Sequence, residues 1–241
     1  MDVLHNVGDE AMSDEIDVLI YGFGGQGGDI AHLREYLDSR GRTTHMLTLA
    51  GHGGTKEDLH NTSHLDWLDS ARKETAEIAR SYARVNLLGF SMGGLLGIHL
   101  CEMERVNKLV LINTPIYCWN FGVITRSVIS DLRSGGMENI SYYMKNSSKY
   151  TAKSIIDFFK LLHATKGLLP SVVRDNIILQ CIDDEIVHHR SADFIKEKIG
   201  GASQMKFYKG GFHQVFVKAP DIRDGMCEDI YQFLGQSAKT D

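Results

Sequence analysis

The stretch NLLGFSMGGLLGIHL, residues 86–100, decides the fold that this chain is expected to adopt. An apolar run typical of a buried strand leads into GFSMG (89–93), and a helical pattern follows. The pattern G-x-S-x-G between a strand and a helix predicts a tight, strained turn that presents the serine hydroxyl, the nucleophile elbow. Strand and helix cross closely at such a turn, so the flanking residues must be small, as Gly89 and Gly93 are. We therefore expect Ser91 to be a nucleophile; the alternative is a glycine-rich turn with an incidental serine.

Short β-branched runs and helical patterns alternate along most of the chain. The expected strands cover 16–21, 43–49, 84–90, 107–113, 176–182 and 203–208, and the expected helices cover about 29–39, 63–82, 92–104, 190–199 and 221–235. Ser63 and Asp66 fit an N-cap of the second helix. Near-continuous apolar strands suit a parallel sheet that is covered on both faces. The alternation therefore predicts one α/β domain over residues 1–241, with a mostly parallel central sheet and helices on both faces.

The alternation breaks between Asn113 and Asn176, where no good strand occurs. This segment contains a helix-like stretch at 154–165 and several aromatic residues, namely Tyr117, Trp119, Phe121, Tyr142 and Tyr143. Ligands of α/β sheets bind beyond the carboxyl ends of the strands. We therefore expect residues 116–169 to form a helical cap or lid with an apolar pocket beneath it. The alternative is a helical excursion that completes the core.

Composition excludes several classes of partner. The chain has 241 residues, is 43% hydrophobic and carries a net charge of −5 with both signs interspersed, so no nucleic-acid or polybasic membrane surface is expected. The first fifteen residues are acidic and lack the apolar core of a signal peptide, and no apolar run approaches the length of a membrane span. The four cysteines form no C-x-x-C pair and fit buried thiols in a reducing compartment. A cytoplasmic location is the expectation.

A serine nucleophile needs a base to take its proton and a carboxylate to orient that base. In folds with this elbow, the chain order is serine, then aspartate or glutamate, then histidine. His213 lies behind Gly210 and Gly211 in a loop after the last expected strand, and it is the only histidine beyond His189. The order therefore predicts His213 as the base.

Two aspartates compete for the role of the orienting carboxylate. Asp183 and Asp184 both follow the strand expected at 176–182. Either one could cap the strand while the other reaches the imidazole. The spacing D-x-x-V from Asp184 to Val187 favours Asp184.

Several segments resemble the bacterial carboxylesterase and monoacylglycerol lipase branch of the α/β-hydrolase superfamily. They are AGHGGTKEDL (50–59), LLGFSMGG (87–94), LQCIDDEIV (179–187), GGFHQVF (210–216) and EDIYQFL (228–234). The resemblance covers nearly the whole chain and is weakest at 116–169. It implies an α/β-hydrolase fold, with Asp184 as the acid and with the backbone N–H groups of Phe23 and Met92 as the oxyanion hole. Two positions depart from the pattern, since Tyr21 replaces a common histidine and His188 a common proline.

A second glycine pattern admits a different interpretation. Gly22, Gly24 and Gly27 spell G-x-G-x-x-G after a strand, as in a dinucleotide-binding turn. That interpretation needs an acidic residue about 20 positions on, at the end of the next strand. The strand at 43–49 instead continues into Ala50 and Gly51, so the glycines are expected to let the backbone approach a substrate carbonyl and no cofactor is expected.

Histidines elsewhere carry weaker signals. His60 and His64 are four residues apart, but the glutamate of H-E-x-x-H is absent, so capping or surface roles are favoured and no metal is expected. His52 is expected to brace its own loop through hydrogen bonds. His188 and His189 are expected in the loop near the pocket rim.

The sequence as a whole predicts a serine carboxylesterase that hydrolyses short- to medium-chain acyl esters or monoacylglycerols through Ser91, His213 and Asp184. The alternatives are a thioesterase, an amidase or other chemistry on the same three residues, or a non-hydrolytic ligand receptor on the same fold. The expected partner is a small ester substrate, with a homodimer as an option.

Overall fold

The computed structural model describes residues 13–118 and 150–236 of the chain. All six expected strands occur in it, namely β1 (Ser13–Ile20), β2 (Thr44–Met46), β3 (Tyr82–Phe90), β4 (Val106–Ile112), β5 (Asp175–Cys181) and β6 (Ser203–Tyr208). They form one sheet in the order β2-β1-β3-β4-β5-β6, and every pairing among them is parallel. The predicted fold class is confirmed, and β3 and β4 lie at the centre of the sheet.

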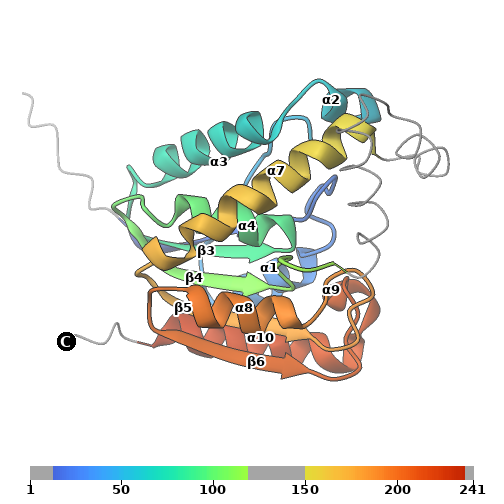
Figure 1. Cartoon of the computed structure of the whole chain (residues 1–241). Helices are drawn as coiled ribbons and strands as arrows, with labels where there is room; N and C mark the ends of the chain where they lie inside the picture. The colour runs from blue at the N-terminus through green and yellow to red at the C-terminus, as the bar shows by residue number, and fades with distance from the viewer. Residues whose placement is uncertain (1–12, 119–149, 237–241) are drawn as a thin grey trace, which may run out of the picture.

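Helices cover both faces of the sheet (Figure 1). On one face, α1 (Ala31–Ser39) contacts α10 (Pro220–Gly235) and the short α9 (Val215–Lys218). On the other face lie α3 (His64–Ile78), α4 (Met92–Leu100) and α7 (Ala152–Leu168), and a 3₁₀ turn η1 (Leu169–Ser171) joins this layer to α8 (Arg190–Lys198). The short α2 (Lys56–His60) precedes α3.

The α4 helix is apolar on nearly every side, which identifies it as a core helix. It lies between the sheet and the pair α3 and α7, and eight of its residues are buried. At the start of α3, Asp66 accepts hydrogen bonds from the Ser63 N–H at 2.8 Å and from its hydroxyl at 2.7 Å, so the predicted cap is formed. None of the helices within 13–118 and 150–236 has the length and apolar character to cross a bilayer.

The cysteines fit the expectation of core thiols. All four are free, and Cys101, Cys181 and Cys227 are buried. Burial raises the pKa of each of these three thiols to about 12.

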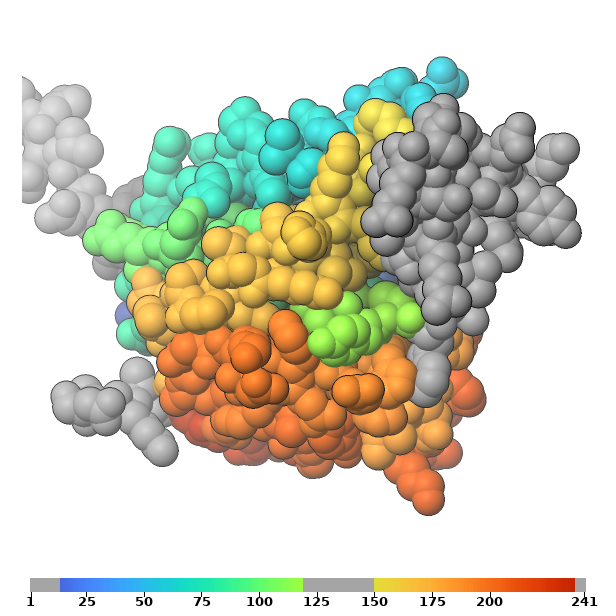
Figure 2. Space-filling model, in the orientation of Figure 1, coloured from blue at the N-terminus to red at the C-terminus, as the bar shows by residue number. Residues whose placement is uncertain are grey.

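Most of the described part of the insertion is the long helix α7. Phe158, Leu161 and Leu162 are buried on it, and the helix packs against α4 and α3. In Figure 2, its yellow surface lies between the cyan surface of α2 and α3 and the orange surface of α8. This part of the insertion therefore packs into the core layer, and the lid expected over 116–169 stays a prediction. The expected cap aromatics Trp119, Phe121, Tyr142 and Tyr143 lie outside the described residues.

A partly buried imidazole, that of His99, joins α4 to α7. The Thr165 hydroxyl donates to the Leu161 carbonyl at 2.7 Å, so it accepts from the His99 Nε2–H at 3.0 Å. Burial lowers the pKa of His99 to about 4, and the nearby Arg72 adds to the effect. A pKa below the unfolded value of about 6.5 means that the unfolded chain binds the proton more readily. The contribution of neutral His99 to the free energy of unfolding is therefore fully present above about pH 6.5, and it is lost as the pH falls toward 4.

We expect His99→Gln to flatten the acid limb of the stability profile. The substitution removes a group that must stay neutral in the fold, so the loss of unfolding free energy between pH 7.5 and 4.5 should shrink by roughly 1–3 kcal/mol, discounted because the imidazole is partly exposed. Denaturant unfolding at the two pH values measures this difference. His60→Gln, at an exposed position on α2, is the control and should leave the slope as it is. An unchanged slope in His99→Gln would contradict the prediction.

Candidate active site

Ser91 occupies the turn between β3 and α4 with φ 51° and ψ −121°. A non-glycine residue in this left-handed region costs about 1–3 kcal/mol and persists only where its surroundings hold it. The Ser91 N–H donates to the Ile112 carbonyl at 2.8 Å, and the Ser91 carbonyl accepts from the Gly94 N–H at 2.9 Å. The serine is thus held by the end of β4 and by the first turn of α4, as the elbow interpretation requires.

The flanking glycines allow the helix to approach the sheet. A Cβ on Gly93 would lie 1.9 Å from the Ile20 carbonyl oxygen, and one on Gly89 would lie 2.5 Å from the Gly94 Cα. A Cβ on Gly94 would lie 2.0 Å from the Thr114 hydroxyl. At Gly89 and Gly93 the obstacle is backbone, so these two glycines are required for close backbone contact, as expected from the sequence, and at Gly94 it is the Thr114 side chain.

His213 lies between Ser91 and Asp184. Its Nδ1 is 2.8 Å from Asp184 Oδ2, and its Nε2 is 3.0 Å from Ser91 Oγ. An ionised carboxylate only accepts hydrogen bonds, so the Nδ1–H donates to Asp184 and Nε2 is left to accept from the Ser91 hydroxyl. All three residues are buried, with exposed fractions of 8% for Ser91, 2% for Asp184 and 7% for His213. The structure thus brings together the three residues that the sequence singled out.

The two aspartates that follow β5 have different partners. Asp184 Oδ1 accepts from the Ile186 N–H at 2.8 Å and from the Val187 N–H at 2.7 Å, which fixes the carboxylate under the imidazole. Asp183 Oδ2 instead accepts from the Gly210 N–H at 2.6 Å. Asp184 is the aspartate that reaches the imidazole, and Asp183 ties its own loop to the loop of His213.

Two residues of this site were not found from the sequence. Glu185 Oε2 accepts from the His213 N–H at 2.9 Å, and the Asn113 amide donates to the His213 carbonyl at 3.0 Å. Burial favours a higher pKa for Glu185, but the His213 N–H and Lys218 outweigh it, and the net shift of the pKa is downward. The run of acidic residues at 183–185 was visible in the sequence. Nothing in it indicated that the third residue, Glu185, would bind the backbone N–H of His213.

The N–H groups proposed for the oxyanion hole come from two segments. Met92 is the first residue of α4, and Phe23 follows β1 in the loop 21–30. Within the described part of the chain, neither N–H has a hydrogen-bond partner. The Gly22 N–H donates to Asp29 Oδ2 at 3.2 Å and the Gly25 N–H to the Gly22 carbonyl at 3.1 Å, which fixes the turn around Phe23. The glycines of this loop therefore shape the turn that carries Phe23.

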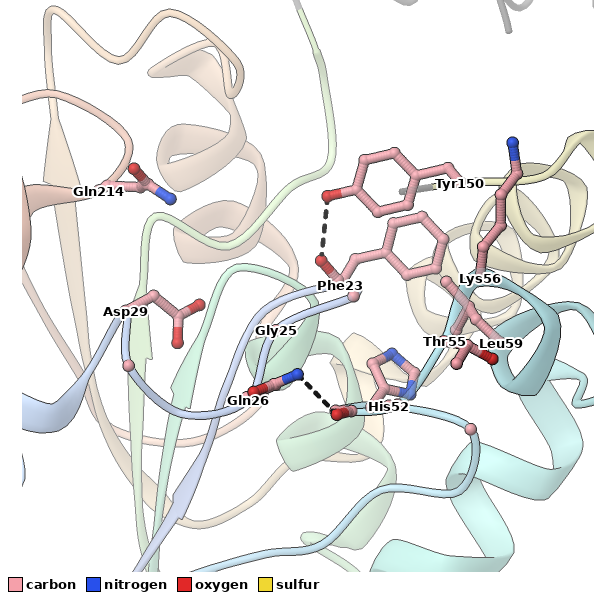
Figure 3. A pocket seen from close by; sticks show the side chains of 15 residues that line it. Phe23, Gly25, Gln26, Asp29, His52, Thr55, Lys56, Leu59, Tyr150 and Gln214 are labelled. Carbon is pink, nitrogen blue, oxygen red and sulfur yellow. Dashed lines mark hydrogen bonds between the residues drawn. The ribbon is translucent and has the colours of Figure 1, made fainter. Parts of the chain in front are cut away.

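Tyr150, just before α7, packs on this loop (Figure 3). Its ring stacks on Phe23 with centroids 4.8 Å apart and an interplanar angle of 10°, and its hydroxyl donates to the Phe23 carbonyl at 3.3 Å. Gly24 adopts φ +65°, and a Cβ there would lie 2.6 Å from the Tyr150 ring. The segment that carries Phe23 is thus held by the start of the insertion helix.

Tyr21, one of the two departures from the family pattern, connects two loops. Its hydroxyl accepts from the Leu49 N–H at 3.0 Å, and burial raises its pKa. His52 Nδ1 lies 3.0 Å from the Ala50 carbonyl, so the histidine braces its own loop, as expected. The two rings lie 6.1 Å apart.

A pocket of about 510 Å³ opens between the loop of Phe23 and the loop of His52 (Figure 3). Its polar lining includes Gln26, Asp29, His52, Thr55, Lys56 and Gln214. Among the described residues, Asp29 Oδ1 and His52 Nε2 are buried and have no hydrogen-bond partner. Burial raises the pKa of Asp29 and lowers that of His52. Sequence reasoning anticipated an apolar pocket and did not foresee this polar one, whose lining residue Gln214 directly follows His213.

His60 and His64, the pair with the spacing of metal ligands on a helix, have separate partners. His60 Nδ1 is 3.2 Å from the Thr151 hydroxyl, and His64 Nδ1 is 2.9 Å from Asp157 Oδ1. Both contacts join α2 and α3 to the start of α7. Within 13–118 and 150–236, no cluster of three or more histidine, cysteine, aspartate or glutamate residues has metal-binding geometry.

Comparison with known proteins agrees with the fold. Residues 18–127 match the family model described as the alpha/beta hydrolase fold. The chain has the α/β-hydrolase fold. This hydrolase is 24% identical over 229 residues to a carboxylesterase of Bacillus subtilis (strain 168), with 92% of each chain covered. It is 25% identical over 198 residues to a thermostable monoacylglycerol lipase of Bacillus sp. (strain H-257), with 78% of this chain and 77% of the relative covered.

A solved structure shares the same fold. A soluble variant of monoglyceride lipase from Saccharomyces cerevisiae, in complex with a substrate analog, superimposes with a TM-score of 0.75 at 15% identity. The alignment covers 96% of this hydrolase and 89% of that chain. Together these likenesses support the expected enzyme class, a carboxylic ester hydrolase.

We expect Gly93→Ala to destabilise the hydrolase by about 3 kcal/mol or more, because the new Cβ would collide with the Ile20 carbonyl and push α4 off the sheet. Denaturant unfolding of the purified variant measures the loss, and a failure to obtain folded protein agrees with it. Gly167→Ala is the matched control. Its Cβ would meet nothing within 4 Å on α7, so it should stabilise by about 0.5–1 kcal/mol. Wild-type stability in Gly93→Ala would contradict the close-approach account.

Proposed function

We propose that the protein is a serine carboxylesterase that hydrolyses short- to medium-chain acyl esters or monoacylglycerols. One observation carries the proposal: the His213 imidazole lies 3.0 Å from the hydroxyl of Ser91 and 2.8 Å from the carboxylate of Asp184. This arrangement suits a nucleophile, a general base and an orienting acid in the roles that acyl transfer requires.

In the acylation step, the Ser91 oxygen attacks the carbonyl carbon of the ester while His213 Nε2 takes the hydroxyl proton. Asp184 accepts the Nδ1–H throughout, which holds the productive tautomer and stabilises the imidazolium. The tetrahedral intermediate then collapses, the bond to the alcohol oxygen breaks, and His213 returns the proton to the leaving alcohol. The product is an acyl group esterified to Ser91.

Negative charge develops on the carbonyl oxygen as the tetrahedral intermediate forms. The N–H groups of Met92, at the N-terminus of α4, and of Phe23 are free to donate to that oxygen. A single donor of this kind typically contributes about 10²–10³ in rate. In deacylation a water molecule loses a proton to His213 and attacks the acyl carbon. The bond to Ser91 Oγ then breaks, His213 returns the proton to that oxygen, and the acid leaves.

The substrate range rests on the expected apolar character of the insertion and on the names of the relatives, a carboxylesterase and a monoacylglycerol lipase. The rings of Phe23 and Tyr150 stack on each other, and both residues line the pocket, where they supply apolar surface of the kind an acyl chain needs. The lid formed by 116–169, the cytoplasmic location and the homodimer stay predictions.

We expect purified protein to hydrolyse p-nitrophenyl esters, with kcat/KM highest for short to medium acyl chains in a series from acetyl to palmitoyl. Ser91→Ala should lower kcat by at least about 10⁴-fold, because the attacking oxygen is gone while the fold is kept. Release of p-nitrophenol measures this directly. A series of acyl thioesters and amides run in parallel would reveal a preference for the alternative chemistries. Binding of esters without turnover by the wild type would instead identify a receptor.

A pair of aspartate variants serves as the control for the assignment of the acid. Asp184→Asn removes the carboxylate that orients the imidazole, and kcat should fall by about 10³–10⁴-fold. Asp183→Asn changes a neighbouring aspartate whose partner is the Gly210 N–H, and kcat should stay within about ten-fold of the wild type. A larger loss in Asp183→Asn than in Asp184→Asn would overturn the assignment.

A further inference from the structure

Asn113 occupies an unusual backbone position at the carboxyl end of β4. Its φ is 45°, and apart from Ser91 it is the one non-glycine residue with a positive φ in 13–118 and 150–236. It is fully buried, with an exposed fraction of 0%. Asparagine tolerates the left-handed region better than most residues. The conformation still costs free energy, and it persists only where the surrounding structure holds it.

The Asn113 side chain connects β4 to two other segments. Its Oδ1 accepts from the Cys181 N–H at 2.8 Å, at the end of β5 and three residues before Asp184. Its Nδ2 donates to the His213 carbonyl at 3.0 Å and to the Phe212 carbonyl at 3.4 Å. The amide therefore accepts through Oδ1 and donates through Nδ2, and every partner is a backbone group.

These contacts fix the peptide unit that carries the His213 imidazole. On the N-terminal side, the His213 N–H donates to Glu185 Oε2 at 2.9 Å, and on the C-terminal side its carbonyl accepts from Asn113. The Glu185 bond comes from an exposed side chain, whereas the Asn113 bond is buried. A buried hydrogen bond has little competition from water, so the Asn113 amide is the firmer of the two anchors.

The backbone of Ile112, the residue before Asn113, contacts the backbone of Ser91. The Ile112 carbonyl accepts from the Ser91 N–H at 2.8 Å, and the Asn113 N–H donates to the Leu179 carbonyl of β5 at 2.9 Å. The dipeptide 112–113 thus touches the segments of the nucleophile, the acid and the base. Ser91, Asp184 and His213 come from three different loops. Their mutual distances therefore depend on a segment that contacts all three loops, and residues 112–113 form such a segment.

We propose that Asn113 is a positioning residue that sets the His213 imidazole relative to Ser91 and Asp184. The inference rests on the proposed function, because it concerns the efficiency of proton transfer from Ser91. Asn113 does not touch the reacting atoms and is not a catalytic residue. A misplacement of about 1 Å at a reacting centre can cost about 10²-fold in rate, so loss of this anchor should act on kcat. It should leave KM nearly unchanged, because no wall of the described pocket includes Asn113.

Two variants separate positioning from a general effect on the fold. Asn113→Gly removes both sets of amide bonds and suits a positive φ without strain. Asn113→Asp keeps an acceptor for the Cys181 N–H but replaces the donor to the His213 carbonyl by an oxygen. Asn176→Asp is the matched control. Asn176 is equally buried, and its amide donates to the Arg174 and Ala202 carbonyls at 3.1 and 3.2 Å, at the opposite end of β5 from the site.

The experiment measures kcat and KM on a p-nitrophenyl ester, the melting temperature, and the low-field proton resonance of the His213 Nδ1–H, which reports the hydrogen bond to Asp184. We expect kcat to fall about 10- to 100-fold in Asn113→Gly and Asn113→Asp, with KM within about two-fold of wild type and the resonance moved upfield or broadened. Asn176→Asp should lower the melting temperature and leave kcat and the resonance in place.

A wild-type kcat and resonance in folded Asn113→Gly would overturn the inference, even if its melting temperature falls. Failure of both Asn113 variants to fold would also overturn it, since the residue would then serve the fold alone. Absence of turnover by the wild-type protein is a different result. That result would refute the proposed function. Turnover by the wild-type protein is therefore measured before any variant is compared.

Discussion

The structure depends on one close approach, that of the N-terminus of α4 to the end of β1. The backbone of Gly93 passes so near the Ile20 carbonyl that even a methyl group would lie 1.9 Å from it. Beside this contact, Ser91 adopts a positive φ of 51°, and α4 begins at the next residue, Met92. The strained serine and the N-terminus of α4 thus lie next to the closest packing contact between helix and sheet, and the other parts of the site are arranged around them.

The other parts of the site reach the same edge of the sheet because all the strands run parallel. The carboxyl ends of β1, β3, β4 and β5 lie at this edge, so the loop of Phe23, the elbow, Asn113 and the acid loop become neighbours. Hydrogen bonds between loops then fix their separations: Asp183 binds the Gly210 N–H, and Glu185 binds the His213 N–H. The imidazole is held through its backbone as well as through its ring, which explains how a residue 122 positions beyond the serine is placed 3.0 Å from it.

Much of this could be predicted from the sequence because it leaves a pattern there. The elbow has fixed spacing between small residues, the strands are continuous apolar runs, and chain order left His213 without a competitor. Asn113 and Glu185 leave no such pattern, since their partners are backbone groups of a loop distant in sequence and backbone groups have no residue identity. The polar pocket was missed for a similar reason: Asp29 and His52 come from separate loops that only the fold brings together. The choice between Asp183 and Asp184 needed the direction of two adjacent side chains, which spacing alone does not fix.

The central claim is that the Ser91 hydroxyl loses its proton to His213 and attacks an acyl carbonyl. The most direct test is mass spectrometry of the protein after treatment with a fluorophosphonate probe, with the modified peptide sequenced. The account predicts one adduct per chain, located on Ser91, and its loss when His213 is replaced by alanine. An unmodified Ser91 in folded wild-type protein, or modification that continues at the same rate without the imidazole, would contradict it.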